Sequence, residues 1–294
     1  MDLVMSRNIQ ICVFAYNLER TIEKSLTNLI TSCAEYTPDI YVMINGCRDN
    51  TYSIVSKLAN DNPRIHPIDI ALGDKSNAWN TFIFQYYDKS SLAIFADGDL
   101  LFEANAVKNL IDYHQRYPQY NAISSFPCAY GRSSQQWRYN LLKEHQFTGA
   151  LYLLSPRFAN LLIEQGVKLP VGLIGDDSML GYLSATDICS GTDLPKQRIG
   201  VCSSAVFIYE SLNPFNWQDC KLYLRRRLRY SLRYFQQLSI VGNLKQHGIQ
   251  AMPVMAIEGT VAPFCKIRWL SSNLFFDLIS KVMIDRQRKK IIKT

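Results

Sequence analysis

The chain has 294 residues, of which 48% are hydrophobic and 19% are charged. This length allows one large domain or two modest ones, and this apolar content can fill a sizeable core, so the composition excludes a mainly disordered protein. Gly and Pro number only 14 and 11, which excludes a collagenous or low-complexity chain. The net charge of +7 favours anionic partners such as phosphates or acidic lipids.

The eight cysteines are scattered and form no C-x-x-C pair. That spacing excludes a zinc ribbon or a thioredoxin-type site and is typical of core thiols in a reducing compartment. The opening MDLVMSRNIQICVF lacks the pattern of a secretory signal, and Asp277 and Lys281 interrupt the most apolar late segment, 269–284. We therefore expect a cytoplasmic protein without a spanning helix, either free or peripheral on the cytoplasmic face of a membrane.

The first half of the sequence alternates short, β-branched apolar runs with amphipathic helical patterns. This periodicity predicts strands over 9–15, 40–44, 65–70 and 92–95, and helices over 19–36, 51–60 and 76–88. Strands that alternate with helices imply βαβ crossovers and a mainly parallel sheet that is buried on both faces. Ligands bind beyond the carboxyl ends of the strands in such sheets, so we expect functional residues at the strand ends.

The pattern loosens after residue 104. It predicts a helix over 104–116, a strand over 120–126, an irregular stretch over 127–145, a strand-like run over 147–154 and helices over 156–165 and from Asp176. An arginine-rich helix over 214–238 and a basic amphipathic helix over 266–294 follow. We expect a boundary near residue 210, with an α/β domain over 1–210 and a helical extension over 211–294.

The most informative motif is AIFADGDLLF at 93–102, in which an apolar strand ends in Asp97, Gly98 and Asp99. Two neighbouring carboxylates suit a Mg²⁺ or Mn²⁺ ion that carries a diphosphate, because such ions bind through a few carboxylates and phosphate oxygens. The glycine would let a ligand approach the backbone. Aspartates that only form a turn fit the same pattern, so both interpretations stay open.

Two further charged clusters stand later in the chain. Asp176 and Asp177 begin a helical pattern, where they fit either a favourable helix N-terminus or a general base that deprotonates a hydroxyl. Arg226 and Arg229 share one helix face at a spacing of three, so both could reach one anionic group. A solvated basic face is an equal alternative for the two arginines.

Taken together and in this order, the segments resemble the family 2 glycosyltransferases of the GT-A fold. The resemblance covers about residues 8–230 and rests on motifs that appear in the order the family has them. These are FAYN at 14–17 with Glu19, NGCRDNT at 45–51, GDKSNAWN at 73–80, DGD at 97–99, DD at 176–177 and RRLRY at 226–230.

The resemblance implies a Rossmann-like GT-A domain that transfers a sugar, with inversion, from a nucleotide-diphosphate donor to a hydroxyl of a glycan or lipid-linked acceptor. The donor is most often a UDP-sugar in this family, and the cation is Mn²⁺ or Mg²⁺. Asp99 would be the principal metal ligand, and Asp97 would contact the metal or the ribose. Asp177 would be the general base, with Asp176 as the second candidate. The residues implied to contact the nucleotide-sugar are Ala15, Tyr16, Glu19, Asn45, Lys75, Asp97, Gly98, Asp99, Arg226 and Arg229.

Two other functions fit parts of the pattern. A nucleotidyltransferase on a similar sheet would be expected to carry a glycine-rich phosphate loop, which FAYNLER at 14–20 lacks. A non-catalytic protein of the membrane surface could keep the fold and use the basic C-terminal helix. No RNP, helix-turn-helix or zinc-finger pattern is present, so we expect no nucleic-acid partner.

The segment 266–294 leaves two interpretations open. Its apolar residues recur at helical spacing and its basic residues gather toward the end, a layout that fits a helix lying on an acidic membrane. The same apolar face could instead pack on the catalytic domain. The apolar residues concerned are Leu270, Leu274, Phe275, Leu278, Ile279 and Val282.

Overall fold

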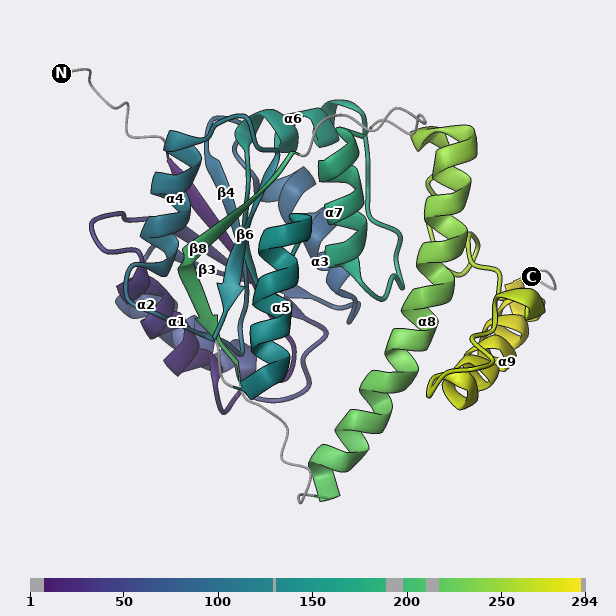
Figure 1. Ribbon diagram of the computed structural model, residues 1–294. Coiled ribbons are helices and arrows are strands. Elements are labelled where there is room, and N and C mark those ends of the chain that lie inside the picture. The colour runs from purple at the N-terminus through teal and green to yellow at the C-terminus, as the bar shows by residue number, and fades with distance from the viewer. Residues whose placement is uncertain (1–7, 129–130, 189–197, 210–216, 292–294) are drawn as a thin grey trace.

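The computed structural model describes residues 8–128, 131–188, 198–209 and 217–291. Within these ranges a sheet of eight strands is covered by helices, and a long helix with a helical C-terminal unit stands beside it (Figure 1). The strands are β1 (Ile9–Ala15), β2 (Asp39–Asn45), β3 (Ile65–Ile70), β4 (Leu92–Asp97), β5 (Leu101–Phe102), β6 (Ala122–Pro127), β7 (Leu151–Leu154) and β8 (Ile199–Ile208).

The strand order is β3-β2-β1-β4-β7-β6-β8-β5. The first four strands in this order are mutually parallel, and β6 is parallel to β8. Strand β7 runs antiparallel to β4 and β6, and the short β5 runs antiparallel to β8. This mixed α/β architecture with a mainly parallel sheet confirms the predicted fold class.

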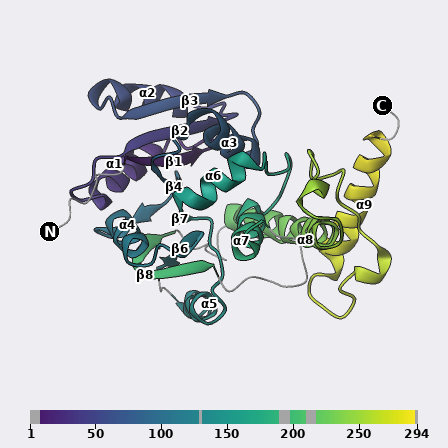
Figure 2. The ribbon, with the colours of Figure 1, turned by 90° about the horizontal axis from the view of Figure 1, so that it is seen from above.

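Helices cover both faces of the sheet (Figure 2). Side chains alternate along β1, so Ile11 and Val13 face one core while Cys12 and Phe14 face the other. The helices are α1 (Ile22–Ser32), α2 (Thr51–Asp61), α3 (Lys75–Thr81), α4 (Ala106–Arg116), α5 (Gly131–Glu144), α6 (Pro156–Glu164), α7 (Asp176–Thr186), α8 (Trp217–His247) and α9 (Leu274–Ile291). Buried residues of α1, α2 and α4 join the first core, and those of α3, α6 and α7 join the second.

Short π- and 3₁₀-helical turns complete the described secondary structure. The π-helical η1 (Phe82–Tyr86) continues α3, and the 3₁₀ turns are η2 (Ile249–Ala251) and η3 (Phe264–Lys266). Helix α8 packs on the sheet domain because Ile240 and Leu244, near its C-terminal end, are buried in the second core. Its other side packs on α9 through a smaller cluster that contains Phe235 and Ile284.

The sequence-based prediction differs from the structure at several elements. The stretch predicted as irregular, 127–145, contains α5, whose composition is mostly polar and whose Leu141 is fully buried. Strand β8 was not predicted, because two exposed residues interrupt its buried pattern. The C-terminal helix begins at Leu274, later than predicted, and its predicted end, with Lys293, lies outside the described residues.

The expected domain boundary near residue 210 falls in 210–216, also outside the described residues, so the two-domain division stays a prediction. In the described part of the chain, the helices are all too short or too polar to cross a membrane.

Candidate active site

Three motif residues end parallel strands at one edge of the sheet. Ala15 is the last residue of β1, Asn45 of β2 and Asp97 of β4. The backbone N–H of Gly98 donates to the carbonyl oxygen of Phe14 at 2.9 Å. A Cβ on Gly98 would lie 2.8 Å from that oxygen, so only glycine permits the chain to leave β4 this close to β1.

The loops after β1 and β2 are joined by hydrogen bonds. The Leu18 N–H donates to Thr51 Oγ1 at 2.8 Å, and the Arg48 N–H donates to Asn17 Oδ1 at 2.8 Å. Glu19 Oε2 accepts from the backbone N–H and the side-chain amide of Asn50, both at 3.1 Å. The structure therefore places the carboxylate of Glu19 on the neighbouring loop, where it braces the two loops against each other.

A polar and aromatic rim lies beside these loops. Asn45 is buried, and its Oδ1 accepts from the Asp74 N–H at 2.8 Å, which ties the end of β2 to the start of α3. The side chain of Tyr16 is 55% exposed. An exposed ring next to a polar loop can stack on a planar ligand such as a nucleobase.

Lys75 at the start of α3 connects two of the motif carboxylates. Its Nζ lies 2.7 Å from Asp97 Oδ1 and 3.4 Å from Asp176 Oδ2. Burial lowers the pKa of the Lys75 ammonium, but the charges of Asp176 and Asp97 outweigh burial and hold this pKa above its usual value. Burial also raises the pKa of Asp97 to about 6, against the opposing charge of Lys75. Three segments that are far apart in sequence thus meet around one ammonium group.

Asp177, the second residue of α7, is paired with a residue from α8. Its Oδ1 lies 3.1 Å from Arg233 Nη2 and accepts from the Ser178 N–H at 2.8 Å. Burial raises the pKa of the Asp177 carboxyl more than the charge of Arg233 lowers it. A Cβ on Gly149 would lie 2.6 Å from the Cβ of Asp177, so glycine there lets the chain before β7 approach α7 closely.

These groups line one cavity of about 270 Å³. Helix α8 closes one side of this cavity with Arg229, Tyr230 and Arg233. The full lining is Lys75, Asp97, Trp137, Thr148, Gly149, Ala150, Ile174, Gly175, Asp176, Asp177, Arg229, Tyr230 and Arg233. The cavity therefore brings together the GDKSNAWN, DGD, DD and RRLRY motifs.

Five of the predicted site residues line this cavity, namely Lys75, Asp97, Asp176, Asp177 and Arg229. The other seven do not, and these are Ala15, Tyr16, Glu19, Asn45, Gly98, Asp99 and Arg226. Asp99 and Arg226 are both exposed, and within the described ranges neither borders the cavity. Arg233, in contrast, was not among the predicted site residues. It follows Arg229 by four positions and so shares its helix face, which is the sequence signal that could have identified it.

The carboxylates at the end of β4 fit a hard divalent cation only in part. Across the residues that the structure describes, no group of three or more His, Cys, Asp or Glu side chains could hold a metal ion. Asp97 and Asp99 offer two oxygen donors, of which Asp99 faces solvent. This donor set fits Mg²⁺ or Mn²⁺ if the ion takes its other ligands from a bound diphosphate and water.

The chain is similar to several solved structures. It resembles the mannosyltransferase PcManGT from Pyrobaculum calidifontis in complex with GDP-Man and Mn²⁺, with a TM-score of 0.63 and 18% identity over 93% of this chain and 73% of that one. It also resembles TarS 1–349 from S. aureus in complex with UDP-GlcNAc, with a TM-score of 0.52 and 13% identity over 96% of this chain and 92% of that one.

A third similar structure is glucosyl-3-phosphoglycerate synthase from Mycobacterium tuberculosis in complex with Mn²⁺, UDP-Glc and phosphoglyceric acid. Its TM-score is 0.54, with 17% identity over 80% of each chain. At these identities the likeness shows the fold alone. No curated protein sequence matches the chain.

The family assignment comes from the sequence match. Residues 10–166, more than half of the chain, match the family described as "Glycosyl transferase family 2". Together with the GT-A fold of the similar structures, this match shows that the protein belongs to glycosyltransferase family 2 and is a sugar transferase.

Proposed function

We propose that this glycosyltransferase moves a sugar, with inversion and in the presence of Mn²⁺ or Mg²⁺, from a nucleotide-diphosphate donor to a hydroxyl of a glycan or lipid-linked acceptor. A UDP-sugar is the proposed donor. The observation that carries the proposal is the single cavity in which Lys75, Asp97 and Asp177 lie together with the arginines of α8.

The nucleotide would bind at the carboxyl edge of the parallel strands. There Ala15, Tyr16 and Asn45 form the floor and rim for a base and ribose, while Glu19 fixes the two loops that carry them. Lys75 would lie near the diphosphate, where its charge would attract the donor. The similar structures contain GDP-Man, UDP-GlcNAc or UDP-Glc, which supports a nucleotide-sugar as the donor class.

Asp99 would hold the cation, together with Asp97. A bound Mn²⁺ or Mg²⁺ supplies positive charge against the negative charge that develops on the departing diphosphate. The exposure of Asp99 supports this role, because a ligand shared with an incoming donor must face the solvent from which the donor arrives. Lys75 already neutralises Asp97 in part, so Asp99 is the proposed principal ligand.

Asp177 would act as the general base. In the proposed displacement the acceptor oxygen forms a bond to the anomeric carbon, the acceptor proton passes to Asp177, and the bond electrons leave with the nucleoside diphosphate. Burial raises the pKa of Asp177, which makes its carboxylate a stronger base than an exposed one. Attack and departure on opposite faces of the sugar then invert the anomeric configuration.

Asp177 is preferred to Asp176 as the base for a geometric reason. The side chain of Asp176 is 14% exposed and pairs with Lys75, whereas that of Asp177 is 27% exposed and faces the arginine side of the cavity. A base must reach an acceptor that enters from solvent. Asp176 is therefore proposed to position Lys75, and Arg233 to orient Asp177.

We further propose a catalytic domain over 1–210 and a helical extension over 211–294 in a cytoplasmic protein. Because α8 supplies Arg229, Tyr230 and Arg233, the extension would complete the cavity.

The test is turnover with a panel of UDP- and GDP-sugars and Mn²⁺, with release of the nucleoside diphosphate as the signal and saccharide or lipid-linked hydroxyls as acceptors. We expect release with at least one donor, loss of release in EDTA, and a product of opposite anomeric configuration by NMR. Retained configuration would overturn the inverting mechanism. Nucleotidyl transfer with release of pyrophosphate would overturn the donor chemistry.

A further inference from the structure

The C-terminal unit exposes a group of large apolar side chains that we call the apolar surface. The exposed fraction is 104% for Leu270, 67% for Phe275 and 60% for Phe264. Single exposed apolar residues are ordinary, but several within one short stretch mark an interaction site. The apolar surface consists of Phe264, Trp269, Leu270, Phe275, Leu278 and Val282.

The members of the apolar surface gather at one end of α9. In the loop before the helix, the rings of Phe264 and Trp269 meet edge to face, with centroids 4.8 Å apart. A turn in which the Leu274 N–H donates to the Ser271 carbonyl oxygen at 3.1 Å joins this loop to α9. On the helix, Phe275, Leu278 and Val282 recur at spacings of three and four and so share one face. The loop and the first half of α9 therefore form one continuous stretch.

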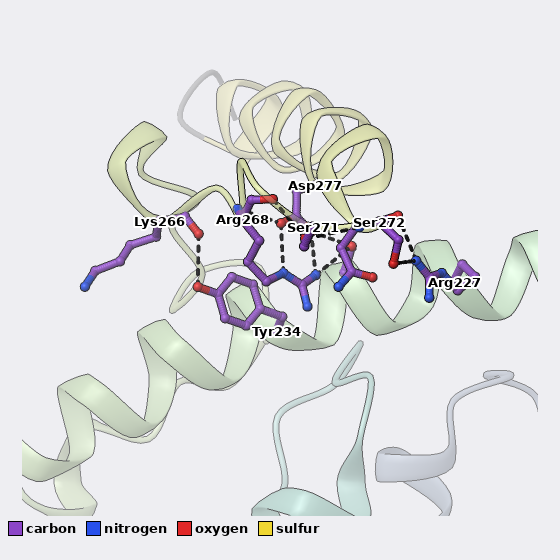
Figure 3. A network of polar contacts seen from close by, with 9 residues as sticks. Arg227, Tyr234, Lys266, Arg268, Ser271, Ser272 and Asp277 are labelled. Atoms are coloured by element: carbon purple, nitrogen blue, oxygen red, sulfur yellow. Dashed lines mark hydrogen bonds and ion pairs between the residues drawn. The ribbon is translucent and has the colours of Figure 1, made fainter. Parts of the chain in front are cut away.

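The rotation of α9 about its axis is fixed by a buried carboxylate. Asp277 is fully buried, and its Oδ1 accepts from Ser231 Oγ and Arg268 Nη2, both at 2.5 Å (Figure 3). Its Oδ2 also accepts from the backbone N–H of Arg268 at 3.1 Å and from its Nε at 2.9 Å. Because a buried carboxylate that loses its partners is costly, α9 cannot roll to hide its apolar face.

The helix therefore packs with an unexpected side inward. Asp277, Ser280 and Ile284 are buried, with Asp277 and Ile284 against α8, while Phe275, Leu278 and Val282 stay exposed. Helix α9 does brace the protein, as one of the two sequence interpretations proposed, but it does so through a different face. The apolar face that the sequence singled out remains mostly without a partner in the described chain.

The part of the chain that carries the apolar surface is rich in positive charge. Residues 217–291 contain 14 Lys and Arg but only four Asp and Glu. Because the whole chain has a net charge of only +7, the residues outside this range carry a net negative charge. Arg286 and Lys289 continue the helix face of Val282 at spacings of four and three, and both are exposed. Lys266, in the loop, is exposed as well.

We propose that the apolar surface docks on an anionic lipid bilayer, with its apolar side chains in the interface and the basic residues on the headgroups. Exposed Trp, Phe and Leu beside Lys and Arg have the chemistry of interfacial membrane binding. A second copy of this chain would bring two strongly positive surfaces together, and like charges disfavour that contact. The bilayer is thus the occupant with complementary charge.

Helix α8 links this docking surface to the cavity. On one side of α8, Arg227 donates to the carbonyl oxygen of Ser272, in the loop before α9, at 2.7 Å. On another side of α8, Arg229 and Arg233 line the cavity. Both α9 and α8 would then lie between the bilayer and the cavity, and each helix with its side chains is about 10–12 Å across, so the cavity would lie within roughly two helix diameters of the membrane. If the proposed function holds, docking would bring a membrane-borne acceptor hydroxyl near Asp177, but the docking itself does not require turnover.

The test measures binding of the full chain to sedimented vesicles of pure phosphatidylcholine and of a phosphatidylcholine and phosphatidylglycerol mixture. We expect binding to the anionic vesicles alone, weakened by salt, since each Lys or Arg near the surface contributes about 1 kcal/mol, roughly fivefold in partitioning. Leu270→Asp with Phe275→Ser should weaken binding at least about tenfold, because buried Leu and Phe side chains supply the apolar part of the affinity. Arg286→Gln with Lys289→Gln should weaken it to a similar extent.

The matched control is Leu142→Asp on α5, which alters a 50% exposed leucine far from α9 in sequence and should leave binding unchanged. Brominated lipids should quench the fluorescence of Trp269, with Trp269→Phe as the reference. Circular dichroism verifies that each variant is folded.

Equal recovery in the supernatant with both vesicles would overturn the proposal, as would binding that survives both double substitutions. A monomer produced from a dimer by Leu270→Asp, without vesicle binding, would identify a second copy as the occupant instead.

Discussion

Arg233 of α8 lies 3.1 Å from Asp177 of α7, between Nη2 and Oδ1, and this pair joins the helical extension to the carboxylate proposed as the base. The arginine has two effects on Asp177. Burial raises the pKa of the Asp177 carboxyl, and the charge of Arg233 lowers this pKa in part. The position of Arg233 also fixes one carboxylate oxygen of Asp177. Both residues lie outside the segment matched to the family, 10–166, so the proposed chemistry depends on a part of the chain that this match does not cover.

Replacing Asp177 tests its assignment as the base. Asp177→Asn keeps the shape of the side chain and removes its basicity, so we expect donor binding to persist while transfer falls by about 10²–10⁴. Single-turnover kinetics and calorimetric binding of the nucleotide-sugar measure the two effects separately. The comparison variant is Asp176→Asn, for which we expect weaker donor binding through Lys75. If the two variants exchange these results, the base is Asp176.

The pH dependence of Arg233→Gln tests the positioning role. Because the charge of Arg233 lowers the pKa of Asp177, its removal should raise that pKa, and the acid limb of the kcat/KM profile should move to higher pH. Arg225→Gln, at an exposed position of the same helix, is the control and should leave the limb in place. An unmoved limb in Arg233→Gln would show that the pair does not control the ionisation of the base.

Metal-dependent binding tests Asp99. A ligand at 100 times its Kd adds about 2.7 kcal/mol to the free energy of unfolding, so a nucleoside diphosphate with Mn²⁺ should raise the Tm of the wild type. Asp99→Ala should abolish the part of this rise that requires Mn²⁺. Glu103→Ala, at another exposed acidic residue nearby in sequence, should retain it. An unchanged Mn²⁺ effect in Asp99→Ala would contradict the ligand assignment.

Two glycine substitutions should change stability in opposite directions. In Gly149→Ala the new Cβ would lie 2.6 Å from the Cβ of Asp177, so α7 must shift, and we expect a loss of about 1–3 kcal/mol in the free energy of unfolding together with a loss of transfer. In Gly242→Ala, within α8, the new Cβ meets nothing within 4 Å. That change should stabilise the protein by about 0.5–1 kcal/mol. Urea unfolding measures both, and equal effects would contradict the close packing at Gly149.

The strand ends were predictable from sequence because local patterns specify them. Apolar runs that end in Asn45 and Asp97 identify the strands, and parallel strands bring their carboxyl ends to one edge. The contact between Arg233 and Asp177 was not predictable in the same way, because it depends on how a distant helix crosses α7. The sequence could offer only the helix face that Arg233 shares with Arg229.

The orientation of α9 was also beyond the sequence pattern. Periodicity identified the apolar face correctly but could not show which face packs inward, because the deciding partner of Asp277 is Arg268, in the loop before the helix. Once the guanidinium and Ser231 satisfy the carboxylate, a polar residue can occupy the buried side. A single ion pair thus outweighs the apolar pattern of the helix.

The stability of this unit should depend on pH through Asp277. Burial alone would raise the pKa of Asp277, but the hydrogen bonds from Arg268 and Ser231 outweigh burial and hold the pKa below its usual value. A carboxyl with a lowered folded pKa stabilises the folded state fully above its unfolded pKa, about 4, and loses this contribution as the pH falls toward the folded pKa.

We therefore expect Asp277→Asn to lower the free energy of unfolding by about 3 kcal/mol at neutral pH. This is the low end for breaking a buried ion pair, because the side chain of Arg268 is 30% exposed. The difference from the wild type should shrink below about pH 4. Lys281→Gln, which removes a surface pair with Asp285, is the control and should cost only about 0.3–0.5 kcal/mol. Urea unfolding followed by circular dichroism at several pH values measures both variants, and a difference for Asp277→Asn that stays constant across pH would contradict an ionised, paired carboxylate at the centre of the α8–α9 contact.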